Sequence, residues 1–347
     1  MRMSFRRSFL AQLLSVILAC SSASWGWGNA GHAAVAYVAW QQLTPETRTR
    51  VMALLMQVPT LQSPEHKTIP GYAEWVKDLP DGLSDDQKNL YLFMRAATWP
   101  DTIKHVGFHD SDDPPKGVTQ DVNIGYSDTA SHGYWHFVDA GFASDSSTVP
   151  PTPVPNAETQ IVAFRQAISS DESDALKSYD LVWLEHMVGD IHQPLHGTAR
   201  YFQNKSDEGG NLVMIKLPVP MEKKFEGTVS KSAPRELHAF WDDLPGEGDP
   251  VSALPVAAAF AKGLPTPSAE KVADTDPSDW AVESLTLAKA DAYAPPIGKS
   301  PQPAKSASGS SAYLITVAYY NKAMQDAQDR VALAGARLAK LLNENLK

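Results

Sequence analysis

The chain has 347 residues, of which 43% are hydrophobic and 20% are charged, and its formal net charge is −10. This length accommodates one large domain or two ordinary ones, and 9 tryptophans make the chain too apolar to be largely disordered. No apolar run approaches ~20 residues, which excludes a polytopic membrane protein. The acidic balance argues against a basic groove that grips duplex phosphates along its length.

Residues 1–26 have the pattern of an export signal, with arginines before an apolar stretch that is too short to span a bilayer. We expect cleavage after Gly26, so that Trp27 becomes the N-terminus of an exported protein, either periplasmic or secreted. The only cysteine, Cys20, lies in this signal, so the mature chain has no disulfide. Two alternatives stay open, cleavage after Ala23 and lipidation of Cys20, although we expect no membrane anchor.

The remaining chain, residues 27–347, is predicted to be mainly helical. A helix is expected over 31–43, and a second begins at Thr44-Pro45-Glu46, where Thr44 can cap and Pro45 fits the first turn. Apolar spacing predicts further helices over 86–98, 157–169, 174–193, 235–243, 252–263, 278–293 and 311–345. Short strands are expected at 134–138 and 211–217, which would suit a small hairpin, and loops at 109–131, 144–156 and 295–310. The predicted fold is therefore mainly α, a single compact helical domain with a few short strands.

Histidine and aspartate recur at a spacing that suits metal binding. His186 and Asp190 are four residues apart in an apolar helix, which places both side chains on one face. His238 and Asp242 repeat this spacing among aromatic residues. His196 follows a proline that ends or bends the helix, which can turn its ring toward the same centre. One such pair is ordinarily a structural ion pair, but two in apolar helices favour a metal, and these ligand types suit zinc.

Residues of the same kinds lie elsewhere at positions where they can join such a site. His32 begins the first helix near the predicted mature N-terminus, and His136 lies within Trp135-His136-Phe137. Asp101 follows a proline at a break in the chain, and Lys104 comes three residues later. Each has an ordinary structural explanation by itself, but together they strengthen the interpretation as a metal site.

In the set and order of these motifs, the chain resembles the zinc-dependent single-strand-specific nucleases, the nuclease S1/P1 family. The matching motifs are Trp27 to His32, Trp99-Pro100-Asp101, Trp135-His136-Phe137, His186-x-x-x-Asp190, His196, Asp207-Glu208-Gly209-Gly210-Asn211 and Leu237-His238 to Asp242. After about residue 243 the chain matches only as helices, without motifs. The combination is specific, although no single motif is.

The resemblance implies a mainly α-helical fold around three zinc ions. Carried over residue by residue, one zinc would be bound by Asp101, His136, His186 and Asp190. A second would be bound by His196, His238 and Asp242. The third would be bound by the α-amine and carbonyl of Trp27 and by His32, with Asp190 shared with the first.

The implied activity is hydrolysis of single-stranded DNA and RNA to 5′-phosphate products by a monomer, with 3′-nucleotides as further substrates. Zinc lowers the pKa of a bound water to about 7, which allows attack on phosphorus at neutral pH. The expected catalytic residues are Asp101, Asp190 and Lys104, and Lys104 could neutralise a phosphate oxygen.

A base pocket is expected beside this centre. Phe137 offers a stacking face next to His136, and Asp139 can accept a hydrogen bond from a base amine or ring NH. The resemblance points to the same pair, and Asn211 in the Gly-Gly-Asn loop is a further expected substrate-binding residue.

Two other functions use the same residues. Bacterial zinc-dependent phospholipase C also resembles this arrangement and would hydrolyse phosphatidylcholine, but the base pocket and the Gly-Gly-Asn loop favour the nuclease. A non-catalytic zinc-stabilised binding protein would need coordinatively closed sites, which a trinuclear cluster is not.

The remaining histidines are interpreted as lying outside the centre. We expect four of them to be solvated in or near polar loops: His66, His105, His109 and His132. His192 is expected to be a hydrogen-bond partner near the ligands rather than a ligand.

Overall fold

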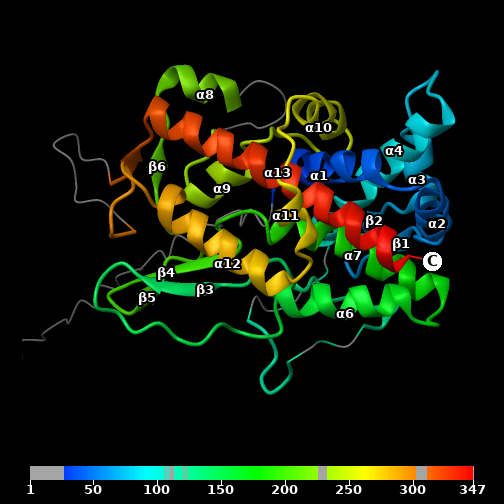
Figure 1. Cartoon of the computed structure of the whole chain (residues 1–347), viewed down its shortest axis with the longest axis horizontal. Coiled ribbons are helices and arrows are strands. Elements are labelled where there is room, and N and C mark those ends of the chain that lie inside the picture. The colour runs from blue at the N-terminus through cyan, green and yellow to red at the C-terminus, as the bar shows by residue number, and fades with distance from the viewer. Residues whose placement is uncertain are drawn as a thin grey trace, which may run out of the picture.

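The computed structural model describes residues 27–104, 106, 108, 113–119, 121, 123–225, 233–301 and 311–346, and it confirms the mainly α-helical fold (Figure 1). The predicted helices are α1 (Asn29–Gln42), α2 (Pro45–Leu55), α4 (Asp85–Ala96), α6 (Ala157–Ser169), α7 (Asp174–Asp190), α9 (Leu237–Asp242), α10 (Ala253–Ala261), α12 (Pro277–Leu287) and α13 (Val317–Asn345). Four shorter helices were not predicted: α3 (Tyr72–Lys77), α5 (Trp99–Lys104), α8 (Val219–Phe225) and α11 (Ala269–Ala273). The predicted cap of α2 is confirmed, because the Thr44 hydroxyl accepts from Thr47 N.

Helix α7 is the centre of the fold. Every residue from Lys177 to Asp190 is buried, and α1, α2, α5, α6 and α13 pack around it. Its apolar residues are spread around the helix rather than confined to one face, as expected of a helix that other helices surround. In Figure 1 the long α13 crosses the front of the molecule and α6 runs along its lower side. The buried apolar side chains form one connected cluster, so a polar side chain on α7 lies deep in the protein.

The strands are short and form three small sheets among the described residues. β3 (Ala140–Ala143) pairs in parallel with β4 (Thr198–Phe202), and β4 pairs antiparallel with β5 (Lys205–Ser206). β1 (Leu61–Gln62) pairs antiparallel with β2 (Thr68–Ile69), and β6 (Ile215–Lys216) pairs in parallel with β7 (Tyr313–Leu314). The β3–β4 pair joins the segment after His136 to the segment after His196, and so holds two candidate ligands near each other.

The strand predicted at 134–138 is wrong. Gly133–Trp135 is a 3-10 turn, and none of the residues 134–138 is in a strand. Aromatic residues favour strands in general, but Trp135 packs edge-on against Trp183 of α7 and Phe164 of α6. Burial between two helices therefore replaces strand pairing at this position.

The other predicted strand and the loops are partly correct. Of 211–217, only Ile215–Lys216 is a strand, and its partner is β7 rather than a neighbour in a hairpin. The segment 144–156 has no helix or strand, as predicted, whereas Gly125–Ser127 is a 3-10 turn inside the predicted loop 109–131. Part of the third predicted loop lies outside the described residues.

Within the part of the chain that the structure describes, no helix is both long and apolar enough to cross a membrane. The predicted export signal, residues 1–26, lies outside the described residues, so its cleavage stays a prediction. Trp27, the first described residue, is fully buried.

Candidate metal centre

The eight side chains predicted as ligands converge from six separate parts of the fold. His32 lies in α1 and Asp101 in α5, and His136 follows the 3-10 turn Gly133–Trp135. His186 and Asp190 lie at the C-terminal end of α7, and His196 lies in the turn after it. His238 and Asp242 lie in α9. Three groups have one possible ligand atom per residue within 4.8 Å of one another: His32, His186 and Asp190; Asp101, His136 and His186; and His196, His238 and Asp242. These groups could hold metal ions.

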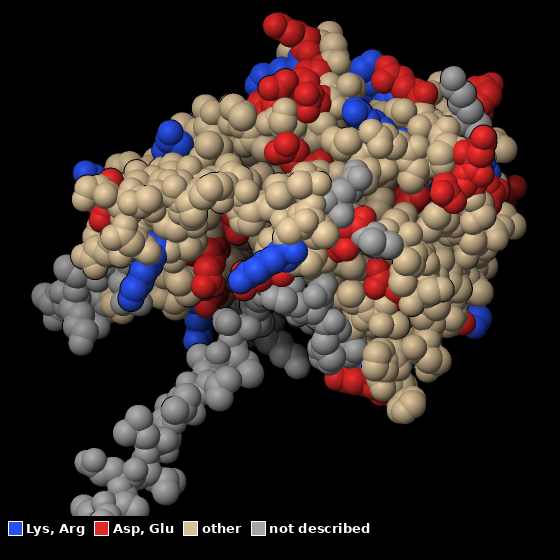
Figure 2. Space-filling view, turned by 90° about the horizontal axis from the view of Figure 1, so that it is seen from below, with Lys and Arg blue, Asp and Glu red and all other residues tan. Residues whose placement is uncertain are grey.

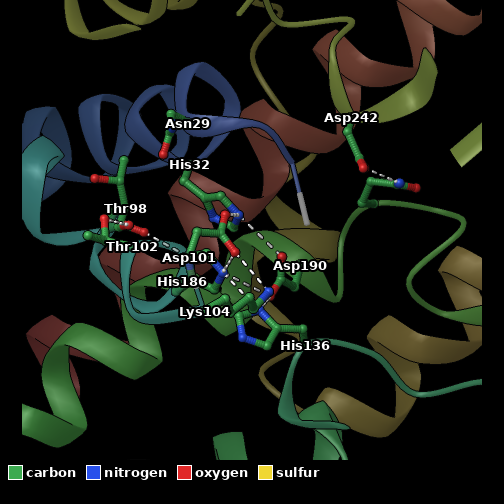
Figure 3. Close-up of polar contacts among 12 residues, drawn as sticks. Asn29, His32, Thr98, Asp101, Thr102, Lys104, His136, His186, Asp190 and Asp242 are labelled. Atoms are coloured by element: carbon green, nitrogen blue, oxygen red, sulfur yellow. Dashed lines mark hydrogen bonds and ion pairs between the residues drawn. The ribbon is translucent and has the colours of Figure 1, made fainter. Parts of the chain in front are cut away.

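Asp190 lies in the middle of the first two groups. Its Oδ1 is 3.3 Å from His32 Nε2, and its Oδ2 is 3.0 Å from His136 Nδ1 and 3.3 Å from His186 Nε2. Asp101 closes the cluster, with Oδ1 3.6 Å from His186 Nε2 and Oδ2 3.9 Å from His32 Nε2. Figure 3 shows these five side chains pointing toward one another from different helices and turns. The two carboxylate oxygens of Asp190 therefore face different groups.

The third group, His196, His238 and Asp242, lies to one side. His196 Nε2 is 2.9 Å from His238 Nε2 and 3.7 Å from Asp242 Oδ1, and His238 Nε2 is 3.6 Å from Asp242 Oδ2. His196 Nδ1 is 3.8 Å from Asp190 Oδ1, which connects this group to the others. Gln193, which sequence reasoning missed, donates from Nε2 to Asp242 Oδ1 at 2.7 Å. Its position in the turn between two predicted ligands was the available signal.

Backbone carbonyls set the orientation of three imidazole rings. Each ring donates from Nδ1 to a carbonyl oxygen: His186 to Ala97 at 2.8 Å, His196 to His136 at 2.7 Å, and His238 to Gly209 at 2.7 Å. A carbonyl only accepts, so Nδ1 carries the proton and Nε2 presents its lone pair. The facing Nε2 atoms of His196 and His238 lie beside the Asp242 carboxylate, so the three side chains could share a cation. Asp190 Oδ1 and Asp242 Oδ2 are also buried without a hydrogen bond, so the donor set fits a metal ion.

Burial keeps most of these imidazoles neutral. It lowers the pKa of His186 and of His238 below the ordinary histidine value, and it lowers that of His136 to about 4. At His196 burial is again the largest effect and acts in the same direction, but the carboxylates of Asp242 and Asp190 together with the His136 carbonyl outweigh it and raise the pKa. Neutral imidazole is the form that binds a metal, so three of the rings are ready to bind one at neutral pH.

The carboxylates are held in their ionised form. Burial by itself would raise the pKa of Asp101, but Lys104 and the nearby imidazoles hold it well below the ordinary value. Burial would likewise raise the pKa of Asp190, and the rings of His186 and His32 hold it well below its usual range. A buried and a half-buried carboxylate that both stay ionised need positive charge nearby, which a bound metal also supplies.

Glycines let Trp27 and His32 approach α7 closely. A Cβ on Gly189 would lie 2.9 Å from His32 Nδ1 and 3.8 Å from Trp27 Cδ1, and a Cβ on Gly31 would lie 2.6 Å from Trp27 Cβ. Trp27 is therefore packed beside the turn of α7 that precedes Asp190. Whether its α-amine and carbonyl bind a metal stays a prediction.

Two predicted substrate residues adjoin the cluster. Lys104 Nζ is 2.9 Å from Asp101 Oδ1, and the lysine side chain is only 8% exposed. Phe137 follows His136 directly and is half-buried at the edge of the core, which leaves part of its side chain exposed to solvent.

The other two predicted substrate residues lie near the Gly-Gly-Asn loop. Burial raises the pKa of Asp139 to about 6, with His196 opposing the shift and Asp207 and Glu208 adding to it. Asn211 donates from Nδ2 to Glu208 O at 2.8 Å, which orients its Oδ1 as the acceptor. Both residues can therefore accept hydrogen bonds from a ligand.

The prediction that His132 is solvated is wrong. The ring is buried and stacks on Trp135 with centroids 3.5 Å apart, and its Nε2 contacts the Asp128 carboxylate. Loop composition did not reveal this, because a left-handed φ of 47° at His132 turns the ring back onto the core.

The other histidines divide as follows. His66 is exposed, as predicted, whereas His105 and His109 lie outside the described residues. His192 is buried and does form hydrogen bonds, but its Nε2 accepts from Arg337 Nη1 at 3.0 Å rather than binding a candidate ligand.

The fold and the converging side chains define the class of protein, a mainly α-helical protein with a multinuclear candidate metal centre. Comparison with known proteins then identifies the family: a sequence profile described as S1/P1 Nuclease matches residues 27–347. The chain therefore belongs to the S1/P1 nuclease family.

Its similarity to individual members is distant but extends along the chain. It is 24% identical to Nuclease P1 of Penicillium citrinum over 336 residues, which is 92% of this chain and 97% of that protein. It is also 24% identical to Nuclease S1 of Aspergillus oryzae over 253 residues, 73% of this chain and 66% of that protein. It is 24% identical to Nuclease PA3 of a Penicillium species over 336 residues, which is 92% of this chain and 97% of that protein. The predicted family and enzyme class, a nuclease that hydrolyses phosphodiester bonds, are confirmed, and the phospholipase alternative is not favoured.

Proposed function

We propose that this nuclease uses three zinc ions to hydrolyse single-stranded DNA and RNA to 5′-phosphate products. The observation that carries the proposal is the 2.9 Å approach of His196 Nε2 to His238 Nε2, with both Nδ1 protons committed to backbone carbonyls. Two imidazole nitrogens held this close to each other and to the Asp242 carboxylate suit a shared cation, and imidazole with carboxylate is a ligand set of zinc.

The proposed ligands of the second ion are therefore His196, His238 and Asp242. Two further ions would share Asp190, because its Oδ1 faces His32 and its Oδ2 faces His136 and His186. A carboxylate whose two oxygens point to different groups suits a bridge between two ions. Asp101, His136 and His186 would complete one of these sites, and His32 with the α-amine and carbonyl of Trp27 would complete the other.

The zinc ions would supply an activated water and positive charge against the phosphate. The chain's own part is to hold a phosphodiester next to them. Lys104 is held by Asp101 at 2.9 Å and is almost buried, so its ammonium is oriented toward the centre and can bind a nonbridging phosphate oxygen. Asp101 keeps that ammonium in place while its other oxygen faces His32.

Selection for single strands follows from the depth of the site. Seven of the eight ligand side chains are at most 5% exposed, so a bond in a stacked duplex would not reach them. A single strand can turn one base out onto Phe137. Asp139 and Asn211 both offer acceptors, which would bind a base that presents ring NH or amine donors.

Such a local contact also fits the acidic surface. On the face seen in Figure 2, blue Lys and Arg side chains are scattered singly among red Asp and Glu, with acidic groups in a hollow near the centre. The affinity for substrate would then come from the metal centre and base stacking rather than from a basic tract. We further propose that the mature enzyme begins at Trp27, is exported without a membrane anchor, acts as a monomer and also accepts 3′-nucleotides.

The first test incubates the chain that begins at Trp27 with a single-stranded oligonucleotide, with and without chelator, and identifies the product ends. We expect chelator-sensitive cleavage to 5′-phosphorylated mononucleotides. His238→Ala should lose zinc and activity, whereas the matched control His66→Ala, which changes an exposed ring, should keep both. A zinc-loaded protein that leaves the oligonucleotide intact would contradict the proposal, and phosphatidylcholine would be the next substrate to test.

A further inference from the structure

The C-terminal helices carry no recognisable motif, yet they contain a buried charged network. Arg330 and Arg337 of α13 are 5% and 0% exposed, and both bind Glu283 of α12. Arg330 Nη1 is 2.7 Å from Glu283 Oε2, Arg337 Nη1 is 2.8 Å from the same oxygen, and Arg337 Nη2 is 3.1 Å from Glu283 Oε1. Arg337 also lies over the ring of Trp280, 5.1 Å from its centroid.

This network binds the turn that follows α7. Arg330 Nε donates to His192 O at 2.9 Å, and Ser284 Oγ donates to Ile191 O at 2.6 Å. Arg330 Nη2 in turn donates to Ser284 Oγ at 2.9 Å, so one guanidinium supports both contacts. Arg337 Nη1 donates to His192 Nε2 at 3.0 Å. The carbonyls at the end of a helix need such donors, and a cation there also complements the helix dipole.

The same turn carries candidate ligands of every metal group. Asp190 is the last residue of α7, and His196 lies six residues later. Between them Gln193 donates to Asp242 Oδ1 at 2.7 Å. Any rotation of residues 191–195 would therefore move Asp190 relative to His196. It would also break the hydrogen bond from Gln193 to Asp242.

Stabilisation of the fold does not by itself explain why charged residues occupy this position. Replacing a buried ion pair by apolar residues is often neutral or stabilising, because the pair must first lose its hydration. Apolar residues could not donate hydrogen bonds in fixed directions. The planar, five-donor guanidinium of Arg330 donates to His192 O and to the Ser284 hydroxyl that binds Ile191 O, and Lys could not replace it fully.

We propose that Arg330, with Glu283 and Ser284 beside it, positions the turn that holds Asp190 and His196 and so maintains the spacing of the metal ions. These are positioning residues, because none of them contacts a ligand side chain. The inference rests on the proposed zinc site and extends it to helices α12 and α13.

The test compares the release of zinc from the mature, zinc-loaded enzyme and three variants. Arg330→Met removes the donors, and Arg330→Lys keeps the charge with one donor group. Ser284→Ala removes the Ile191 contact and the hydroxyl that accepts from Arg330 Nη2, but leaves the Arg330 contact with His192 O. Arg48→Met is the matched control, because Arg48 likewise binds a carbonyl (Trp40 O, 2.8 Å) and a carboxylate, but far from this turn in the chain. The measurements are the rate of zinc transfer to a chelator, the zinc content, and kcat and KM on a single-stranded oligonucleotide.

We expect Arg330→Met to release zinc about tenfold faster, in the range seen for groups that orient metal ligands. The zinc-release rates of Ser284→Ala and Arg330→Lys should lie between those of Arg330→Met and the wild type. The rate of Arg48→Met should equal that of the wild type. Because the changed residues do not touch substrate, kcat should fall while KM stays within about twofold.

Release rates of Arg330→Met and Ser284→Ala that equal the wild-type rate would overturn the inference. If Arg330→Met does not fold, Ser284→Ala decides by itself, since it removes only a hydroxyl. A wild-type protein that binds no zinc would overturn the proposed function as well, whereas zinc-loaded variants that behave as wild type overturn only the positioning role.

Discussion

Replacing Gly209 by alanine should weaken zinc binding by His196 and His238. Gly209 has a φ of 59°, and a Cβ there would lie 2.5 Å from Leu195 O, a backbone atom, and 3.3 Å from His238 Nδ1. A left-handed non-glycine residue costs about 1–2 kcal/mol. Overpacking adds about 1–3 kcal/mol, so the free energy of unfolding should fall by about 2–5 kcal/mol. Relief of the clash must move Gly209 O, which accepts from His238 Nδ1 at 2.7 Å, and the ring would lose its orientation.

Two glycines provide controls that separate the backbone strain from the clash. Gly210 has a φ of 89° but its nearest atoms to an added Cβ are 3.4 Å away, and Gly82 has a φ of 78° with nothing within 4 Å. Alanine at Gly210 or Gly82 should lower the free energy of unfolding only by the cost of the left-handed backbone, about 1–2 kcal/mol. The assays are urea unfolding of the zinc-loaded enzymes and their zinc content after dialysis against a fixed chelator concentration. If Gly209→Ala retains as much zinc as Gly82→Ala, the argument that a carbonyl orients His238 is refuted.

Three further predictions concern the N-terminus, the base pocket and a buried ion pair. One extra residue before Trp27 should remove one zinc, and a full complement by mass spectrometry would rule out the amine ligand. Because burial raises the pKa of Asp139 to about 6, its carboxyl gains a proton as the pH falls through 6, so KM should rise there. Asp139→Asn should keep its zinc, change base preference and abolish this pH dependence, and an unchanged preference would exclude the pocket. Asp207→Asn should lower the free energy of unfolding by about 3–5 kcal/mol, because it leaves buried Arg200 without its 2.9 Å partner. As a control, Asp86→Asn removes the carboxylate of the more exposed ion pair between Arg48 and Asp86, and should lower the free energy of unfolding by less than about 1 kcal/mol. Equal losses of free energy for Asp207→Asn and Asp86→Asn would contradict the reasoning.

The two helical pairs among the candidate ligands could be recognised in the sequence because their pattern is local. A helix places residues four apart on one face, so His186 with Asp190 and His238 with Asp242 were recognisable as pairs before any fold was known. Helix boundaries followed for the same reason, since capping and apolar spacing depend on near neighbours, as at Thr44 of α2. The strand predicted at 134–138 failed because its aromatic composition is common to strands and to segments buried between helices.

Only the tertiary structure decided how these residues are oriented, because the groups that orient them come from distant parts of the chain. Ala97 O accepts from His186 across 89 residues, and Arg330 reaches His192 O across 138. Every residue has a backbone carbonyl oxygen, so the residue type does not reveal which carbonyls accept a hydrogen bond from an imidazole. The sequence by itself indicated which side chains are candidates to bind metal. The packing of α7 among α1, α2, α5, α6 and α13 determined which atoms face one another, because directions in space depend on contacts that no local pattern encodes.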